Sequence, residues 1–571
     1  MLLPAKPRSQ VPSVFGVLSC AFLTAAFSQP FNVKKVSKAV FTLKTFNAEG
    51  ALIASNNGFF IGDDGMAVSS FEPFRGASRA VVIDAQGKEW PVEAICGAND
   101  SYDVAKFRVG VKKVQGLPVA SVQMTEGSEC WLLAVGTQRA VTAEKATVRR
   151  VENFRDEYAY YTLARSVSIV APATDAESCP LLNADGQVVG IMQRAASVAD
   201  SLSYAVDARF ADSLRITGLS INDRALRSVL IKKALPEQKD QALLTLYVAG
   251  ASTDSATYAT MVDDFIAQFP DSPDGYEYRA QLKASANDFA GAQKDMERAI
   301  SVAEQKDEVH LSYSRLIFQK ELYKNDIPYE PWSLDKAYEE AGKAYELTPL
   351  PIYRRQQAQV CYAQKKYDEA YHIYEQLMDS PLRAADLFFE ASRCKEQLRD
   401  TVAQLALLDS AVCQFSRPYL QEAAPYLLAR AQVRHDAGKY RDAVNDLNDY
   451  ESLMRSRLTG HFYYIRFQAE VGGRLYQQAL DDIDKAIGMS PEYDLYYAEK
   501  ASLEIRVGLY EDAIVTAEQC IKVAPDYSDG YLFLGLAQCL KGQKEEGLKN
   551  LQKAKELGDP QAEGLIEKYA Q

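Results

Sequence analysis

The sequence is poor in histidine, in basic charge and in long apolar runs, and each shortage excludes a class of function. None of the first 309 of the 571 residues is a histidine, so this part of the chain lacks an imidazole base. Lysine and arginine number 64 against 77 acidic residues, which excludes nucleic acid as the main partner because phosphate binding needs a basic surface. Beyond the N-terminal segment no run reaches about 18 apolar residues, so no stable transmembrane span is predicted.

The nine cysteines do not follow the spacing of a metal site or of a dense disulfide framework. No two of them form a C-x-x-C pair, which excludes the usual zinc sites. Cys361, Cys394 and Cys520 lie in helical patterns where a small apolar residue would serve, which favours buried free thiols. Glycine-rich phosphate loops are also missing, so we expect neither a cofactor nor a metal.

The first residues have the features of a secretory signal peptide. Lys6 belongs to a basic start, residues 11–27 form an apolar stretch, and small residues precede a cleavage point after Ser28. We therefore predict that residues 1–28 are removed and that the protein is exported to the periplasm, the cell envelope or the medium. Lipidation at Cys20 is the alternative fate of this segment.

Short β-strands are predicted from about residue 40 to residue 208. Val40–Phe46 alternates with period two, and residues 187–191 form a β-branched run. Asp64-Gly65 and Asp185-Gly186 supply the tight turns that join neighbouring strands. Many short strands with such turns indicate an all-β barrel or sandwich, which we place at residues 33–215.

The rest of the chain, residues 220–571, changes to helical periodicity and repeats itself. Ala479, Ala513 and Gly547 follow one another at intervals of 34 residues, with a proline such as Pro525 ending the second helix of a repeat. Two antiparallel helices approach closely only where a side chain is small, and proline stops a helix.

This pattern resembles the tetratricopeptide repeat (TPR) and implies an all-α solenoid. Roughly seven or eight helix pairs are expected, with residues 385–435 irregular enough to hold an insertion or a diverged pair.

Three segments of the β domain carry a second resemblance. They are Gly58–Ser70 followed by Phe71-Glu72-Pro73, the run Asp103-Val104-Ala105, and Asp175–Leu181 followed by a hairpin that ends in Gly190-Ile191. In that order they resemble the base hairpin, the acid segment and the Gly-x-Ser-Gly-Gly-Pro-Leu nucleophile loop of secreted trypsin-like serine proteases, particularly the HtrA type. The resemblance implies a double β-barrel.

The same resemblance implies a degenerate catalytic triad. It places Glu72 at the base position, Asp103 at the acid and Glu177 at the nucleophile, with Asp175 in place of a glycine of the oxyanion hole. A serine triad needs a nitrogen base near neutral pKa and a pocket that stabilises the oxyanion. Carboxylates at these positions repel the developing negative charge, so we expect an inactive pseudopeptidase with no catalytic residue.

Several alternatives stay open at this point. A slip of one residue in the alignment makes Ser178 the nucleophile of a divergent trypsin-like peptidase. Its base would come from a repeat histidine folded over the cleft; the four candidates are His310, His372, His435 and His461. The three carboxylates would otherwise hold Ca²⁺ or act as an acid–base pair, and Cys179 is a further nucleophile without a base.

The most economical function is protein–protein interaction outside the cytoplasm. A TPR array curves around a groove that binds a peptide or a partner helix. A trypsin-like cleft without its nucleophile still accepts an extended strand by main-chain pairing. We expect a scaffold protein with a protein or peptide partner in the TPR groove. The alternative is a purely structural role, in which the barrels cap the solenoid. The sequence leaves the partner and the oligomeric state open.

Overall fold

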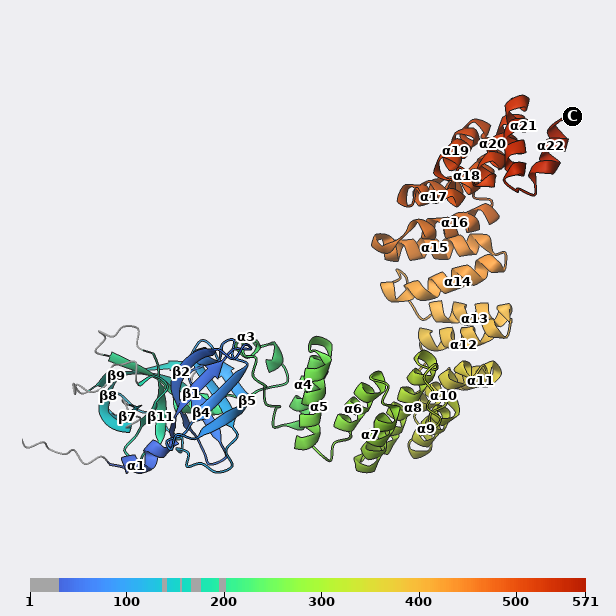
Figure 1. Ribbon diagram of the computed structural model, residues 1–571. Helices are drawn as coiled ribbons and strands as arrows, with labels where there is room; N and C mark the ends of the chain where they lie inside the picture. Colours follow the sequence, from blue (N-terminus) through green and yellow to red (C-terminus); the bar gives the residue numbers. More distant parts are fainter. Residues whose placement is uncertain (1–29, 136–140, 155–156, 166–175, 195–201, 571) are drawn as a thin grey trace, which may run out of the picture. The chain divides into compact units, whose positions relative to one another are not determined.

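The computed structural model divides into two compact units, residues 1–270 and 271–571, which are considered separately (Figure 1). It describes residues 30–135, 141–154, 157–165, 176–194 and 202–570. The predicted signal peptide, Cys20 and Asp175 lie outside the described residues.

The first unit contains the predicted double β-barrel, which is confirmed. Each barrel is closed and consists of six antiparallel strands. The first has the order β1 (Val40–Phe46), β2 (Leu52–Phe60), β3 (Met66–Ser69), β6 (Val104–Val109), β5 (Glu89–Asn99) and β4 (Arg79–Ile83). The second has the order β10 (Pro180–Leu182), β11 (Val188–Met192), β12 (Leu202–Asp207), β9 (Tyr158–Arg165), β8 (Val141–Phe154) and β7 (Glu129–Val135).

One apolar core holds the two barrels together. It includes Phe59 and Val68 of the first barrel and Leu133, Ile191 and Val206 of the second, each almost fully buried. Alternate side chains along each strand point towards the core, as the period-two pattern of the sequence predicts. These inward side chains form both the interior of each barrel and the apolar contact between the two barrels. The loops at the seam are thereby fixed relative to each other.

The chain keeps contact with the first barrel beyond residue 215, where the sequence placed the end of the domain. Leu226 in the short helix α3 (Arg224–Arg227) is buried in the core of that barrel, together with Val229 and Ile231. The next residues run extended beside β5, with a parallel bridge between Ile95 and Lys233. Helices α4 (Lys239–Ser252) and α5 (Ser255–Gln268) follow and complete the first unit.

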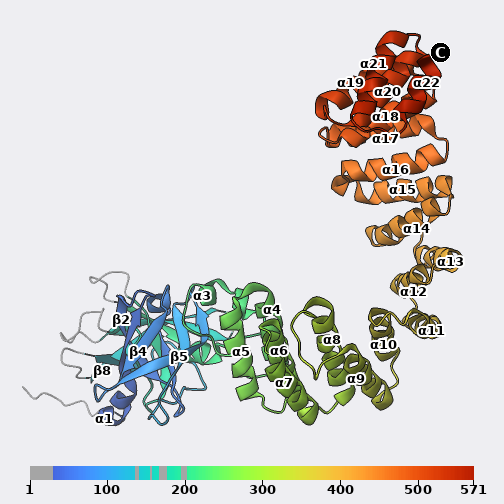
Figure 2. The same ribbon diagram turned by 45° about the vertical axis from the view of Figure 1, so that its right-hand side comes forward.

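The second unit consists of the predicted helix pairs (Figure 2). The pairs are α6 (Pro273–Ser285) with α7 (Phe289–Val302), α8 (Lys306–Tyr323) with α9 (Leu334–Leu347), α10 (Pro351–Ala363) with α11 (Tyr367–Leu377), α12 (Ala385–Gln397) with α13 (Thr401–Val412), α14 (Ala424–Asp436) with α15 (Tyr440–Met454), α16 (Gly460–Gly472) with α17 (Tyr476–Met489), α18 (Asp494–Arg506) with α19 (Tyr510–Val523), and α20 (Ser528–Leu540) with α21 (Lys544–Glu556). A last helix, α22 (Ala562–Ala570), packs on α21.

The region 385–435 holds an ordinary pair, α12 and α13, with a longer connection to α14. None of the helices in the described parts of the chain is long and apolar enough to span a bilayer.

Small residues lie where the helices of a pair cross, as the repeat pattern requires. Ala479 and Ala513 are completely buried. At the crossing of α20 and α21, a Cβ atom added to Gly547 would lie 2.7 Å from the carbonyl oxygen of Gly535. The backbones therefore touch there, and only glycine fits.

Three of the pairs share a buried ion pair that joins the first helix to the second. An arginine donates two hydrogen bonds to an aspartate 16 residues further along, and the aspartate side chains are at most 6% exposed. The pairs are Arg279–Asp295, Arg430–Asp446 and Arg466–Asp482. Two-pronged bonding of this kind fixes the relative position of two helices better than a point charge does.

Glu470 of α16 is a further buried carboxylate beside the Arg466–Asp482 ion pair. Arg466 already donates to Asp482 and to Glu451, and its Nε atom lies 3.8 Å from Glu470 Oε1. The Oε2 atom of Glu470 has no hydrogen-bond partner among the described residues. Burial, with the charge of Asp482 adding to it, raises the pKa of Glu470 from 4.5 to about 8.

We expect this raised pKa to make the repeats less stable as pH rises. The unfolded chain releases the Glu470 proton near pH 4.5, whereas the folded chain keeps it up to about pH 8. The free energy of unfolding therefore falls across this interval. Glu470→Gln removes this loss, so its stability changes less between pH 5 and pH 8 than that of the parent. Urea titration followed by helical circular dichroism measures the difference.

The control is Glu518→Gln, which changes an exposed carboxylate of α19. It should leave the parent's dependence on pH unchanged. Equal pH dependence in Glu470→Gln and the parent would contradict the proposed titration.

Candidate functional site

The seam between the barrels brings the predicted triad segments together. Asp103 lies just before β6 with a positive φ of 49°. Its Oδ1 atom accepts hydrogen bonds from the backbone N–H groups of Phe71, at 2.9 Å, and Glu72, at 2.7 Å. The carboxylate thus ties the loop after β3 to the loop before β6 through main-chain donors.

The side chain of Glu72 does not turn towards this carboxylate. It forms an ion pair with Arg75, at 3.1 Å, and is 60% exposed. Glu72 begins a short 3₁₀ turn, Glu72–Phe74, and its acidic group is therefore a solvated surface charge. The backbone N–H group of Glu72 therefore contacts Asp103, whereas its side chain is paired with Arg75.

Glu177 and Ser178 form the corresponding loop of the second barrel, just before β10. Ser178 has a positive φ of 61° and is completely buried. Its N–H group donates to the carbonyl oxygen of Met192, at 2.9 Å. The adjacent Glu177 is partly buried, with 17% of its side chain exposed. Glu177 is therefore partly accessible, whereas the next residue lies in the interior.

The hydroxyl of Ser178 belongs to a hydrogen-bond network that crosses the seam. Ser178 Oγ donates to Ser70 Oγ at 2.8 Å, and the Ser70 N–H group donates to Ser178 Oγ at 3.0 Å. Asn56 Nδ2 of β2 lies 2.7 Å from Ser70 Oγ and 3.3 Å from Ser178 Oγ. Both hydroxyls are therefore engaged in bonds with neutral groups.

Asn56 also connects this network to Glu177. The distance from Asn56 Nδ2 to Glu177 Oε1 is 3.3 Å. An amide cannot accept a proton at neutral pH, so it does not relay one from Ser178 to the carboxylate. Glu177 is held in place by this contact and does not act as a base for the serine through it.

Burial dominates the electrostatics of the two carboxylates at the seam. It raises the pKa of Asp103, while the N–H donors of Glu72 and Phe71 lower it. It also raises the pKa of Glu177, against the lowering effects of Arg194 and Asn56. Arg194 is 78% exposed and its Nε atom lies 4.0 Å from Glu177 Oε2, so it compensates the charge only loosely.

A serine nucleophile needs a nitrogen base within hydrogen-bond reach. Ser178 is buried, and residues 1–270 contain no histidine, so the first unit itself supplies no imidazole to this serine. Within the described ranges, no group of three or more His, Cys, Asp or Glu residues is placed to hold a metal ion. Cys179, the other nucleophile considered, is also completely buried. The other seven cysteines of the described residues are free thiols.

The sequence pattern did not reveal Asn56, Ser70 and Arg194 as parts of this site. One signal was present: Asn56 and Asn57 are adjacent in a strand, where asparagine is disfavoured. Both side chains face the Glu177 loop, since Asn57 Nδ2 lies 3.4 Å from the carbonyl oxygen of Glu177. Two adjacent asparagines inside a strand therefore indicate that their side chains have polar partners elsewhere in the fold.

The helical unit has a hollow on the side formed by several first helices of its pairs. It encloses about 300 Å³ and is lined by side chains from the first helices of three successive pairs, α8, α10 and α12, and from α11. The lining residues are Phe318, Gln359, Tyr362, Tyr374, Phe389, Glu390 and Arg393. Aromatic walls with one acid and one base provide both apolar contact and polar orientation for a peptide side chain.

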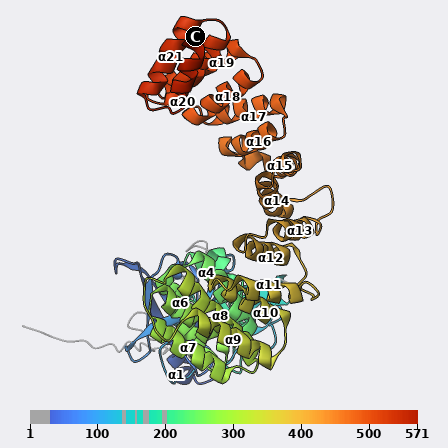
Figure 3. The same cartoon turned by 90° about the vertical axis from the view of Figure 1, so that its right-hand side faces the viewer.

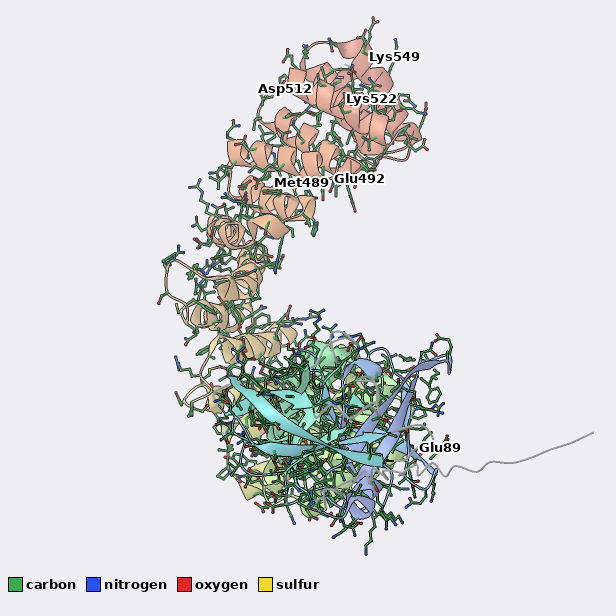
Figure 4. All side chains as sticks on the ribbon, turned by 90° about the vertical axis from the view of Figure 1, so that its left-hand side faces the viewer. Glu89, Met489, Glu492, Asp512, Lys522 and Lys549 are labelled. Atoms are coloured by element: carbon green, nitrogen blue, oxygen red, sulfur yellow. The ribbon has the colours of Figure 1, made fainter. Side chains whose placement is uncertain are left out.

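The later repeats carry exposed charges of both signs. Glu492 and Asp512 are exposed, as are Lys522 and Lys549 (Figure 4). Helices α18 to α21, which carry these residues or lie beside them, form the last two helix pairs and are seen from another side in Figure 3. Mixed charge of this kind is ordinary for a protein surface that meets other polypeptides and differs from the basic surface that binds phosphate.

Comparison with known proteins agrees with this two-part description. The family model for the trypsin-like peptidase domain matches residues 56–191, which confirms the predicted resemblance of this region to that domain. Two solved structures are similar. A protease from M. tuberculosis in its active form is 16% identical, with a TM-score of 0.28, and the match covers 37% of this chain and 92% of that one. The serine endoprotease from Yersinia pestis is 14% identical, with a TM-score of 0.27, covering 36% and 65%.

The curated relatives are TPR proteins. The small glutamine-rich tetratricopeptide repeat-containing protein 2 of Saccharomyces cerevisiae is 26% identical over 136 residues, 24% of this chain and 39% of that protein. The protein of the same name from Mycosarcoma maydis is 31% identical over 90 residues, 16% of this chain and 25% of that protein. The chain thus spans well under half the length of these relatives. Together with the helix pairs, the matches confirm the prediction of a TPR-type array.

We expect Ser178→Ala to destabilise the barrels, because Ser178 bonds across the seam. The substitution leaves the buried Ser70 N–H group without its acceptor, which costs about 1–3 kcal/mol, while Asn56 keeps its contacts with Ser70 and Glu177. Native-state hydrogen exchange of β2 and β3 at increasing urea concentrations measures this loss. Ser55→Ala, an exposed change in the same strand as Asn56, should stay within about 0.5 kcal/mol of the parent. Equal stability of the two variants would show that the network does not stabilise the seam.

Proposed function

We propose that this chain is an exported protein-interaction scaffold, in which a trypsin-like barrel pair that does not cleave peptides is joined to a TPR array that binds a polypeptide partner. The observation that carries the proposal is the state of Ser178. Its hydroxyl is buried and bonded to Ser70 and Asn56, and no histidine precedes His310. A hydroxyl without a base is a poor nucleophile at neutral pH.

The electrostatics of the seam support the same conclusion. Acyl transfer develops negative charge on the substrate oxygen, and hydrogen-bond donors must stabilise it. Here the donors of Phe71 and Glu72 are bonded to Asp103, and the partly buried Glu177 lies beside the serine. A second anion next to an incompletely compensated carboxylate is unfavourable in this low-dielectric setting. The seam therefore favours neutral or cationic groups over an oxyanion.

The hollow of the helical unit supports the binding role. Glu390 is fixed at its edge by Arg355, at 2.9 Å, and by Gln359, at 3.0 Å. Arg393, by contrast, is half exposed and paired only with Glu396 on its own helix among the described residues. A multiply bonded acid and a half-exposed base beside aromatic walls are suited to a peptide that has an acidic and an aromatic or aliphatic side chain.

A cleavage assay tests the absence of peptidase activity. The full-length protein is incubated with fluorescein-labelled denatured casein and, separately, with a fluorophosphonate serine probe. We expect no fluorescence increase above a protein-free control and no labelled band, because the nucleophile lacks its base. Cleavage or labelling that disappears in Ser178→Ala would establish a divergent peptidase and overturn the proposal.

A charge reversal tests the binding role of the hollow. Full-length protein is cross-linked in an extract of the exported fraction of its own cells, and the cross-linked polypeptides are identified. Arg393→Glu should reduce the yield of the specific adduct about tenfold, a loss typical of one interfacial charge contact. Lys549→Glu makes the same change of charge on an exposed residue outside the hollow and should leave the yield unchanged. An adduct that is equally abundant in both variants would place the partner elsewhere.

A further inference from the structure

The first unit contains a cavity that neither the barrels' chemistry nor the TPR groove accounts for. It encloses about 710 Å³ between α3, the extended residues 230–235, α4 and α5. Its lining includes Leu226, Leu230, Ile231, Leu235 and Met261 as apolar members, and Thr245, Thr257, Thr260, Arg227, Lys232, Lys233 and Asp264 as polar ones. This volume lies within the range of about 300–1,000 Å³ that is usual for ligand sites.

The sequence of α5 explains why the space stays open. Thr257, Thr260, Met261 and Asp264 follow the spacing that puts residues on one face of a helix, and all four line the cavity. A helix that packs fully on its neighbour places large apolar residues at such positions. Here two threonines are short and exposed, so α5 does not close down on the extended segment.

The extended segment offers a free main-chain edge to this cavity. Lys232 accepts a hydrogen bond from Ile95 N–H through its carbonyl oxygen, at 2.8 Å, and Ala234 N–H donates to the Ile95 carbonyl, at 2.8 Å. Backbone groups alternate sides along an extended strand, so the N–H and C=O groups of Lys233 point away from β5. No described residue forms a backbone hydrogen bond with them.

The charges around this edge are positive and only partly compensated. Lys232 Nζ forms an ion pair with Asp264, at 2.7 Å. The half-buried ammonium of Lys233 donates to the carbonyl oxygen of Val229, and within the described chain no carboxylate is paired with it or with the exposed Arg227. Burial lowers the pKa of Lys233, and an anionic group nearby would reverse that effect.

We propose that an extended acidic peptide from a partner protein binds in this cavity as an added strand on the main-chain edge at Lys233, next to Ile231, whose own N–H group donates to the Ala77 carbonyl oxygen. Its main chain pairs with the N–H and C=O groups of Lys233, and one of its carboxylates lies between the side chains of Lys233 and Arg227. Alternate apolar side chains of the peptide contact Leu230, which is 62% exposed, and Met261. Main-chain pairing gives affinity in this mode, and the side-chain contacts give specificity.

This inference does not rest on the binding role of the TPR groove, because all the residues concerned belong to the first unit. The two sites are therefore distinguishable by experiment. Arg393→Glu, which changes the hollow of the second unit, leaves the peptide affinity of the first unit unchanged.

The experiment uses the full-length protein and four fluorescein-labelled, capped pentapeptides. Their sequence is Thr-Val-X-Val-Thr, with Asp, Glu, Gln or Lys at the centre, and binding is measured by fluorescence anisotropy. The Asp and Glu peptides should bind about tenfold more tightly than the Lys peptide, because like charges are placed together in that complex. A fifth peptide is an Asp peptide with N-methyl groups at alternate residues. It keeps the charge, cannot pair as a strand, and should lose binding about tenfold or more.

Two pairs of variants separate the contributions of the site. Lys233→Gln removes the charge alone and should weaken the preference for acidic peptides, because Arg227 still faces the peptide carboxylate. Lys233→Pro also removes the N–H donor, while the bonds of Lys232 and Ala234 to Ile95 remain, and it should lower the affinity of every peptide. Thr260→Trp fills the cavity and should abolish binding, whereas Thr260→Val preserves the space and should retain it.

Four results would overturn the proposal. The first is no saturable binding of either acidic peptide, and the second is equal affinity for the N-methylated and the unmodified Asp peptide. The third is unchanged binding in Thr260→Trp. The fourth is competition by inorganic phosphate or acetate as effective as that by unlabelled Asp peptide, which would define a simple anion site in place of a strand site.

Discussion

The hydrogen bonds among Ser178, Ser70 and Asn56 are the interaction on which the interpretation of the first unit depends. They join a loop of the second barrel to strand β2 and to the residue that follows β3, across 108 to 122 residues of sequence. A buried hydroxyl that is bonded on all sides stabilises the seam, and losing it leaves polar groups unsatisfied. The hydroxyl that stabilises the seam is thus the same atom that a serine nucleophile would use.

The Asp103 carboxylate shows a similar reassignment. In a serine triad an acid orients the imidazole and stabilises its charged form. This chain has no imidazole in its first unit, and Asp103 instead binds the N–H groups of Phe71 and Glu72. These contacts use backbone donors, so the geometry of the loop does not require an imidazole from the first unit.

The fold could be predicted from the sequence because regular sequence patterns indicate its strands and its helix pairs. Alternation of period two marks the strands, and an interval of 34 residues between Ala479, Ala513 and Gly547 marks the helix crossings. The site could be predicted only as far as the segments that resemble the protease motifs. Partners such as Ser70 and Asn56 depend on contacts across the seam, and no local pattern specifies those. The positions predicted for Glu72 and Glu177 stay predictions, and the structure adds that one side chain is solvated and the other is bound to Asn56.

The extended edge at residues 231–235 raises a question of specificity that its own charges answer. An unpaired strand edge tends to recruit other strands indiscriminately, and proteins commonly protect such edges with lysine. Lys232 and Lys233 stand on this edge, and only Lys232 is compensated, by Asp264. A neutral or basic strand would bury the Lys233 ammonium without a counter-charge, which is costly, whereas an acidic strand supplies one. Lys233 would then both prevent unwanted strand pairing and select an acidic partner, so one side chain serves both functions.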